Sequence, residues 1–172
     1  PENRRDWLKW FDPGSYAAHI TCPVLYMSAT NDWAYWLDNF ARTYDAMPSA
    51  DKRMALMANG SHSYTGEMIA GKWRWLEGHC QKKGGPLPEV AVVAVKKSAS
   101  EGRLTVEARV TGTPEPDKVE AAYSYGENPV GPSRFWGVAH AEKCGGVWRA
   151  EIPACHDKVC FYVTASRKNE YA

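Results

Sequence analysis

The stretch ITCPVLYMSATND, residues 20–32, joins a strand-like run to the polar residues that follow it. Residues 23–28 form a short apolar run, which is typical of a strand buried on both faces of a sheet. Thr30, Asn31 and Asp32 come directly after this run. Because ligands and catalytic groups gather at the carboxyl ends of strands in open parallel sheets, polar residues at this position favour a functional role, and Asp32 is the candidate among them.

The same pattern occurs again downstream. Residues 53–58 form a second apolar run, and the polar stretch 59–63, NGSHS, follows it. A helical pattern precedes this second run and another follows it. The first has apolar residues at Leu37, Phe40, Tyr44 and Met47, and the second has them at Ile69, Trp73, Leu76 and Cys80. The order strand, helix, strand, helix predicts the end of a parallel sheet with helices on its faces.

The composition changes near residue 85. Residues 82–88, KKGGPLP, are first charged, then Gly-rich and then Pro-rich, as in a linker between domains. Beyond it, apolar and polar residues alternate in residues 103–110, 119–125 and 159–165, and turn-rich segments separate these runs. Such runs predict an all-β, antiparallel, Ig-like sandwich. We therefore expect an α/β domain over residues 1–85 and a β-sandwich domain over residues 86–172.

Asp32 and His62 follow neighbouring strands of the predicted parallel sheet, so we expect them at the same edge. A carboxylate that accepts a hydrogen bond from an imidazole fixes its tautomer and stabilises its protonated form. The imidazole is then a competent general base for a hydroxyl nucleophile. The alternative for Asp32 is to cap the helix-like stretch that begins at Trp33. Ser61 and Ser63 are interpreted as helix caps.

At these residues the sequence resembles the α/β-hydrolase superfamily, in which a strand that ends "small residue, x, x, Asp" carries the catalytic acid. A later Asn/Gly-x-x-His carries the catalytic histidine, as residues 59–62 do here. The resemblance covers roughly residues 18–80 and implies that Asp32 is the triad acid and His62 the triad base. Residues 86–172 resemble the C-terminal domain of secreted hydrolases related to acetylxylan esterases and to PhoPQ-regulated virulence proteins.

The sequence also departs from the superfamily. The nucleophile of α/β-hydrolases lies in a Gly-x-Ser-x-Gly turn, and no such motif occurs in the 172 residues. The chain begins at Pro1, without a signal peptide, and we expect it to be the C-terminal part of a longer protein. The missing N-terminal half of the hydrolase domain would supply the nucleophile and the oxyanion hole, so this chain alone should be inactive.

The leading functional hypothesis is a serine-type hydrolase of carboxylic esters, with acyl groups on polysaccharide as a candidate substrate. Trp33 and Trp36 are candidate substrate-binding residues because their rings can stack on sugar, although core packing explains such a pair equally well. A peptidase of the same fold is one alternative, because the acid and the base do not report the leaving group. Another is a non-catalytic hydrolase-like protein that binds a partner or glycan through sandwich aromatics: Tyr123, Tyr125, Phe135, Trp136 and Trp148.

Charge and hydropathy exclude two classes of partner. The chain has 21 Lys and Arg against 20 Asp and Glu, without a strongly basic block, which argues against nucleic acid. No apolar run approaches the ~20 residues of a membrane span. The family resemblance and a cluster of cysteines near the C-terminus together favour a secreted or periplasmic location.

The cysteines and the remaining histidines suggest structural roles. Cys22 and Cys80 are expected to be buried thiols, whereas a disulfide within the group Cys144, Cys155 and Cys160 is left open. Cys155 and His156 imitate zinc-ligand spacing only loosely, so we expect neither a metal nor another cofactor. Four histidines show no carboxylate or metal-spaced partner along the chain and are interpreted as structural or exposed: His19, His79, His140 and His156.

Overall fold

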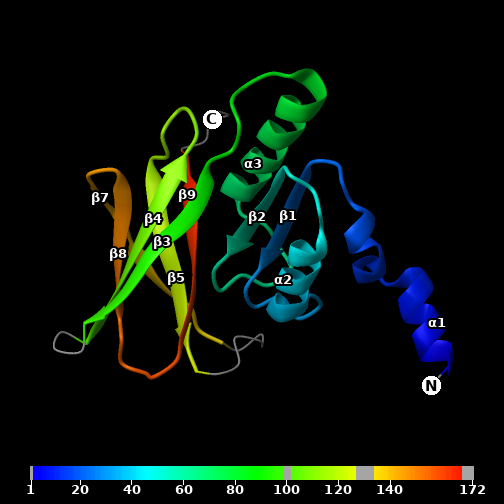
Figure 1. The fold of residues 1–172 in the computed structure, drawn as a ribbon, viewed down its shortest axis with the longest axis horizontal. Coiled ribbons are helices and arrows are strands. Elements are labelled where there is room, and N and C mark those ends of the chain that lie inside the picture. The colour runs from blue at the N-terminus through cyan, green and yellow to red at the C-terminus, as the bar shows by residue number, and fades with distance from the viewer. Residues whose placement is uncertain (1, 99–101, 127–133, 168–172) are drawn as a thin grey trace.

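The computed structural model describes residues 2–98, 102–126 and 134–167. Helices and one pair of parallel strands occupy the N-terminal part of the chain, from residue 2 to residue 81, and antiparallel strands make up the C-terminal part, from residue 89 to residue 166 (Figure 1). The helix α1 lies at the end of the molecule that is remote from the antiparallel strands (Figure 1). The protein is therefore a mixed structure of helices and β-sheets.

The N-terminal part contains two strands, and a helix follows each of them. Its elements are α1 (Glu2–Phe11), the 3-10 helix η1 (Pro13–His19), β1 (Val24–Ala29), α2 (Leu37–Ala46), β2 (Lys52–Met57), α3 (Gly66–Leu76) and the π turn η2 (Glu77–Gln81). β1 and β2 pair in parallel, from Val24 opposite Lys52 to Ala29 opposite Met57. The carboxyl ends of the two strands therefore lie side by side, as the two apolar runs predicted.

The burial of these strands differs from the prediction. In β1 only Ser28 and Ala29 are buried, and all of β2 is half-buried. The expectation of a strand buried on both faces is thus wrong for most of β1. The physical reason is that, among the described residues, β1 and β2 pair only with each other, and other elements cover the faces of this sheet only in part.

The two helices after the strands also differ in how well their apolar faces are covered. α2 buries Phe40, whose ring stacks on Tyr26 of β1 with centroids 3.9 Å apart. In α3 the predicted face is largely exposed, with Ile69 at 40%, Trp73 at 54% and Leu76 at 42%, while Trp75 is buried. The apolar spacing thus predicted the helix correctly, and the described residues leave its apolar face largely uncovered.

The C-terminal part consists of two antiparallel sheets. Its strands are β3 (Glu89–Ser98), β4 (Arg103–Thr111), β5 (Lys118–Tyr125), β6 (Gly137–His140), β7 (Glu142–Cys144), β8 (Val147–Pro153) and β9 (Val159–Ser166). The first sheet has the order β3-β4-β8-β7 and the second has the order β6-β5-β9. Strands were expected at residues 103–110, 119–125 and 159–165, and they are β4, β5 and β9.

The main core lies between these two sheets. Val106 of β4, Ala121 of β5, and Ala150 and Ile152 of β8 form one buried cluster, and further apolar side chains from both sheets pack around it. Alternation along the strands supplies these inward-facing residues, because successive side chains of a strand point to opposite faces. The antiparallel sheets therefore bury a continuous apolar layer.

The cysteines are free thiols. Cys22, Cys80 and Cys155 are exposed, and Cys144 and Cys160 are half-buried. The expectation that Cys22 and Cys80 are buried is wrong, because Cys22 lies in the loop before β1 and Cys80 in the exposed η2 turn. No helix of the described residues is long and apolar enough to cross a membrane.

Candidate active site

Asp32 and His62 form a pair beyond the carboxyl ends of β1 and β2. The Nδ1 atom of His62 lies 3.0 Å from Oδ2 of Asp32, within hydrogen-bond distance. The Asp32 side chain is only 6% exposed, whereas that of His62 is 55% exposed. The structure therefore brings together the two residues that the sequence predicted as a pair, with the carboxylate inside and the imidazole open to solvent.

The second carboxylate oxygen of Asp32 organises the loop that follows β1. Oδ1 accepts hydrogen bonds from the backbone N–H groups of Ala34, at 2.8 Å, and Tyr35, at 3.2 Å. Asp32 thus caps a turn and binds His62 at the same time, one role for each oxygen. It does not cap α2, whose N-cap residue is Trp36.

These contacts set the charge state of Asp32. Burial tends to raise the pKa of this carboxyl, but the hydrogen bonds from Ala34, His62 and Tyr35 outweigh burial and hold the pKa below its ordinary value. The carboxylate is therefore ionised throughout the neutral range. An ionised carboxylate at this distance stabilises the imidazolium form of its histidine partner.

The loop that carries His62 leads into α3. Its capping residue is Thr65, whose hydroxyl oxygen accepts from the N–H of Met68 at 3.2 Å. The expectation that Ser61 and Ser63 are the helix caps is wrong, because the helix begins later than the sequence pattern suggested. Gly60, in the same loop, is closely packed, since a Cβ atom there would lie 1.9 Å from Cε of Met57.

Two aromatic rings flank the imidazole of His62. The ring centroids of Trp33 and His62 are 5.9 Å apart, and those of Tyr35 and His62 are 5.7 Å apart with an interplanar angle of 20°. Trp33 is 64% exposed and Tyr35 is 60% exposed. Trp36, the second predicted substrate-binding residue, is 55% exposed at the start of α2. Sequence reasoning missed Tyr35, although its position two residues after Trp33 in the same loop was visible.

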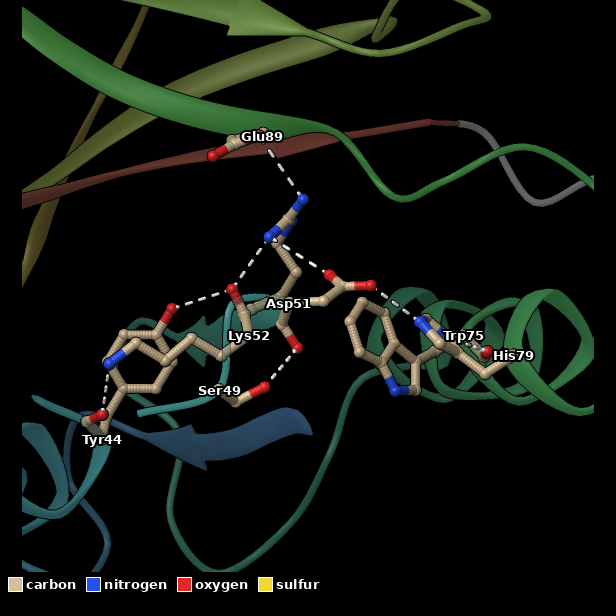
Figure 2. Close-up of polar contacts among 8 residues, drawn as sticks. Tyr44, Ser49, Asp51, Lys52, Trp75, His79 and Glu89 are labelled. Atoms are coloured by element: carbon tan, nitrogen blue, oxygen red, sulfur yellow. Dashed lines mark hydrogen bonds and ion pairs between the residues drawn. The ribbon is translucent and has the colours of Figure 1, made fainter. Parts of the chain in front are cut away.

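A second histidine–carboxylate pair lies at the opposite end of the same strands (Figure 2). Nε2 of His79 lies 2.9 Å from Oδ2 of Asp51, and its Nδ1 lies 2.8 Å from the carbonyl oxygen of Trp75. The hydrogen bond to Asp51, with a further one to Trp75, raises the pKa of His79 above its ordinary value. A third pair joins His140 to Glu120, with 3.0 Å between Nδ1 and Oε1.

These pairs correct the interpretation of His79 and His140 as histidines without carboxylate partners. The sequence could not reveal them because each depends on tertiary contacts. Asp51 precedes β2 and His79 follows α3, so the returning helix brings them together. His140 and Glu120 lie directly opposite each other in the paired strands β6 and β5.

Arg53 links the Asp51–His79 pair to the C-terminal part of the chain. Nη1 of Arg53 lies 3.5 Å from Oδ1 of Asp51, and Nη2 lies 3.4 Å from Oε2 of Glu89 on β3 (Figure 2). A cavity of about 520 Å³ lies beside this contact, between β2, α3 and the strands β5 and β9. Asp32 and His62 are not among its lining residues.

The aromatic residues of the C-terminal part, which the sequence offered as candidates for binding a partner or glycan, differ in exposure. Trp136 is 1% exposed and is a core residue, Phe135 is 78% exposed, and Tyr123, Tyr125 and Trp148 are half-buried. In the described ranges, the His, Cys, Asp and Glu side chains form no group of three or more that could hold a metal ion.

Comparison with known proteins identifies a family. The family model of the PhoPQ-activated pathogenicity-related protein matches residues 2–127, a range that contains Asp32, His62 and the strands β1 to β5. No curated protein and no solved structure matches the chain. Since the matched range covers more than half of the chain, this protein belongs to the PhoPQ-activated pathogenicity-related protein family.

Proposed function

We propose that the chain is the C-terminal part of a serine-type hydrolase of carboxylic esters, in which Asp32 is the catalytic acid and His62 the general base. The observation that carries this proposal is the hydrogen bond between the buried carboxylate of Asp32 and the exposed imidazole of His62. This arrangement leaves the imidazole able to reach a hydroxyl group from another part of the protein. A peptidase would use the same two residues.

In the proposed reaction, a serine outside this chain attacks the ester carbonyl carbon. His62 accepts the hydroxyl proton, and Asp32 stabilises the imidazolium that forms. The tetrahedral intermediate then expels the alcohol, which takes the proton from His62, and an acyl-enzyme remains. Water, deprotonated by His62, hydrolyses the acyl-enzyme and releases the carboxylic acid.

The proposal includes an architecture. β1, β2, α2 and α3 would be the last elements of an α/β-hydrolase sheet, residues 1–85, and the antiparallel sheets would be an Ig-like sandwich domain, residues 86–172. The exposed face of α3 supports this, as does the free edge of β1, which pairs only with β2 among the described residues. Both would be covered by an N-terminal half of the hydrolase domain.

The proposed substrate is an ester carried by a sugar or another ring-bearing molecule. The exposed rings of Trp33 and Tyr35 lie beside His62 and Trp36 follows them, so a flat apolar ring face could stack close to the reacting group. The resemblance to secreted esterase-like hydrolases adds acylated polysaccharide as the substrate class and a secreted or periplasmic location.

The test is fluorophosphonate labelling of the full-length protein, with the adduct located by mass spectrometry. We expect an adduct on a serine outside residues 1–172, because fluorophosphonates react with activated serines. His62→Ala should abolish it, since the serine then has no general base. His79→Ala is the matched control and should leave labelling unchanged. Absence of an adduct on the folded full-length protein would exclude a serine hydrolase.

A further inference from the structure

A short segment of the C-terminal part is bonded to both loops of the candidate active site. The side-chain amide of Asn59 makes two hydrogen bonds to Trp136: Nδ2 donates to its carbonyl oxygen at 2.7 Å, and Oδ1 accepts from its N–H at 2.7 Å. Nδ2 of Asn31 donates to the carbonyl oxygen of Arg134 at 2.5 Å. Asn31 directly precedes Asp32, and Asn59 begins the loop that carries His62.

The two loops are also bonded to each other close to these contacts. Oγ1 of Thr30 accepts from the N–H of Asn59 at 2.9 Å and donates to Oδ1 of Asn31 at 2.7 Å. The N–H of Asn31 donates to the carbonyl oxygen of Gly60 at 3.0 Å. A displacement of one loop relative to the other therefore breaks the hydrogen bonds between them.

The segment that receives these bonds is itself fixed in the C-terminal part. The ring of Trp136 is buried and lies 5.5 Å from that of Tyr162, centroid to centroid. The guanidinium of Arg134 donates to Oγ of Ser124 at 2.5 Å and to the carbonyl oxygen of Tyr125. Oγ of Ser124 donates in turn to the carbonyl oxygen of Phe135 at 2.8 Å. The antiparallel sheets thus offer the loops a rigid anchor.

We propose that Asn59 is a positioning residue of the candidate active site, through which the segment of residues 134–136 holds the His62 loop against Asp32. This inference rests on the proposed function and gives the antiparallel sheets a part in it, because they set the distance between the acid and the base. Placing groups correctly matters greatly for catalysis, since a displacement of about 1 Å can cost roughly 100-fold in rate.

The chemistry of asparagine suits this position in two ways. Its amide carries both a donor and an acceptor, which match the C=O and N–H of a single backbone residue. Asn59 also has a φ of 56°, in the left-handed region that asparagine tolerates better than most residues. Aspartate keeps only the acceptor, and glycine keeps only the backbone conformation.

The experiment compares Asn59→Gly, Asn59→Asp and a control in the full-length protein. Glycine adopts the left-handed conformation without strain, so Asn59→Gly removes the two side-chain bonds and leaves the turn. Lys82→Gly is the control, because Lys82 has a φ of 55° and lies at the end of η2, away from Asp32 and His62. The first readout is the rate constant of fluorophosphonate labelling, taken over the molecules that become labelled, because unfolded molecules do not react. The second is the NMR signal of the His62 Nδ1 proton.

We expect Asn59→Gly to slow labelling roughly 10- to 100-fold and to shift or broaden the His62 proton signal. Asn59→Asp should have at least as large an effect, because its second carboxylate oxygen would face the carbonyl oxygen of Trp136. Lys82→Gly should behave as the wild type. If Asn59→Gly is labelled at the wild-type rate, the positioning role is wrong. If the wild type is not labelled, the proposed function fails, and an unchanged His62 signal in Asn59→Gly would then exclude the positioning role as well.

Discussion

The two ends of the β1–β2 sheet carry the same kind of side-chain pair. Asp32 and His62 lie beyond the carboxyl ends of the strands, with 3.0 Å between Nδ1 and Oδ2. Asp51 and His79 lie at the amino end of β2, with 2.9 Å between Nε2 and Oδ2. Residue type and distance therefore do not separate a candidate catalytic pair from a structural one.

Burial and the remaining partners do separate them. The Asp32 side chain is 6% exposed and that of Asp51 is 47% exposed. Both ring nitrogens of His79 are engaged, one by Asp51 and the other by the Trp75 carbonyl, so neither is available to accept a proton from a nucleophile. The imidazole of His62 bonds Asp32 through Nδ1 and is largely open to solvent. A shielded acid beside an accessible base is the arrangement that proton transfer needs.

The largest expected effect comes from neutralising Asp32, and neutralising Asp51 is the comparison. We expect Asp32→Asn to lower the turnover of a chromogenic ester by the full-length protein about 10⁴-fold, because an amide neither fixes the required tautomer nor stabilises the imidazolium. Asp51→Asn, at the other end of the sheet, should change turnover little. Loss of less than tenfold in Asp32→Asn, or equal losses in both variants, would remove the distinction between the two pairs.

A smaller effect is expected at the aromatic rings near His62. Trp33→Ala should raise KM for an aryl or sugar ester up to about tenfold and change kcat less, because the lost contact is with the bound substrate. Trp36→Ala should have a weaker effect, since Trp33 is the ring beside the imidazole. Steady-state kinetics on the two variants measure this. Equal KM values in Trp33→Ala and the wild type would contradict a substrate contact.

We expect the Asp51–His79 pair to contribute to the stability of the fold. The raised pKa of His79 means that its protonated form is favoured in the folded state, with the bond to Asp51 as the main cause. This stabilisation is complete below the unfolded pKa of about 6.5 and is lost as pH rises through the folded pKa. Urea unfolding of His79→Gln should therefore show a deficit of about 0.5 kcal/mol near pH 5.5 that vanishes near pH 9, given the exposure of Asp51.

The control for this measurement is His19→Gln, at an exposed histidine in η1. It removes a histidine from an element that is not part of the Asp51–His79 pair. A deficit for His79→Gln that grows towards pH 9 has the wrong sign and would show that the charged form of His79 is not the one that stabilises the fold.

The smallest effect is expected at Glu89, which Arg53 links to the Asp51–His79 pair. The two side chains are 3.4 Å apart, and Glu89 is 62% exposed. Glu89→Gln should therefore cost at most a few tenths of a kcal/mol, roughly the value of exposed ion pairs, and the cost should shrink with added salt. Unfolding at low and high ionic strength measures it. A loss that is independent of salt would contradict an electrostatic origin.

The sequence predicted the parts of this structure that depend on local pattern. Apolar runs and periodicity located β1, α2, β2, α3, β4, β5 and β9, and the polar residues after β1 and β2 led to the pair Asp32 and His62. Contacts between distant elements were not predictable. His79 has its partner because α3 returns to the start of β2, and His140 has its partner because of the register of β5 and β6. The covered face of α3 depends likewise on which elements pack on it.

The strand β2 is fastened to the antiparallel sheets at both of its ends. Arg53, near its start, bonds Glu89, and Asn59, just after its end, bonds Trp136. With one attachment, the two parts of the protein could rotate in any direction about a single point. With two attachments along the strand, they can rotate only about the line that joins the two contacts. The segment of residues 82–88 therefore does not act as a free hinge, and any change in the angle between the two parts of the protein, other than rotation about that line, requires at least one of these contacts to open.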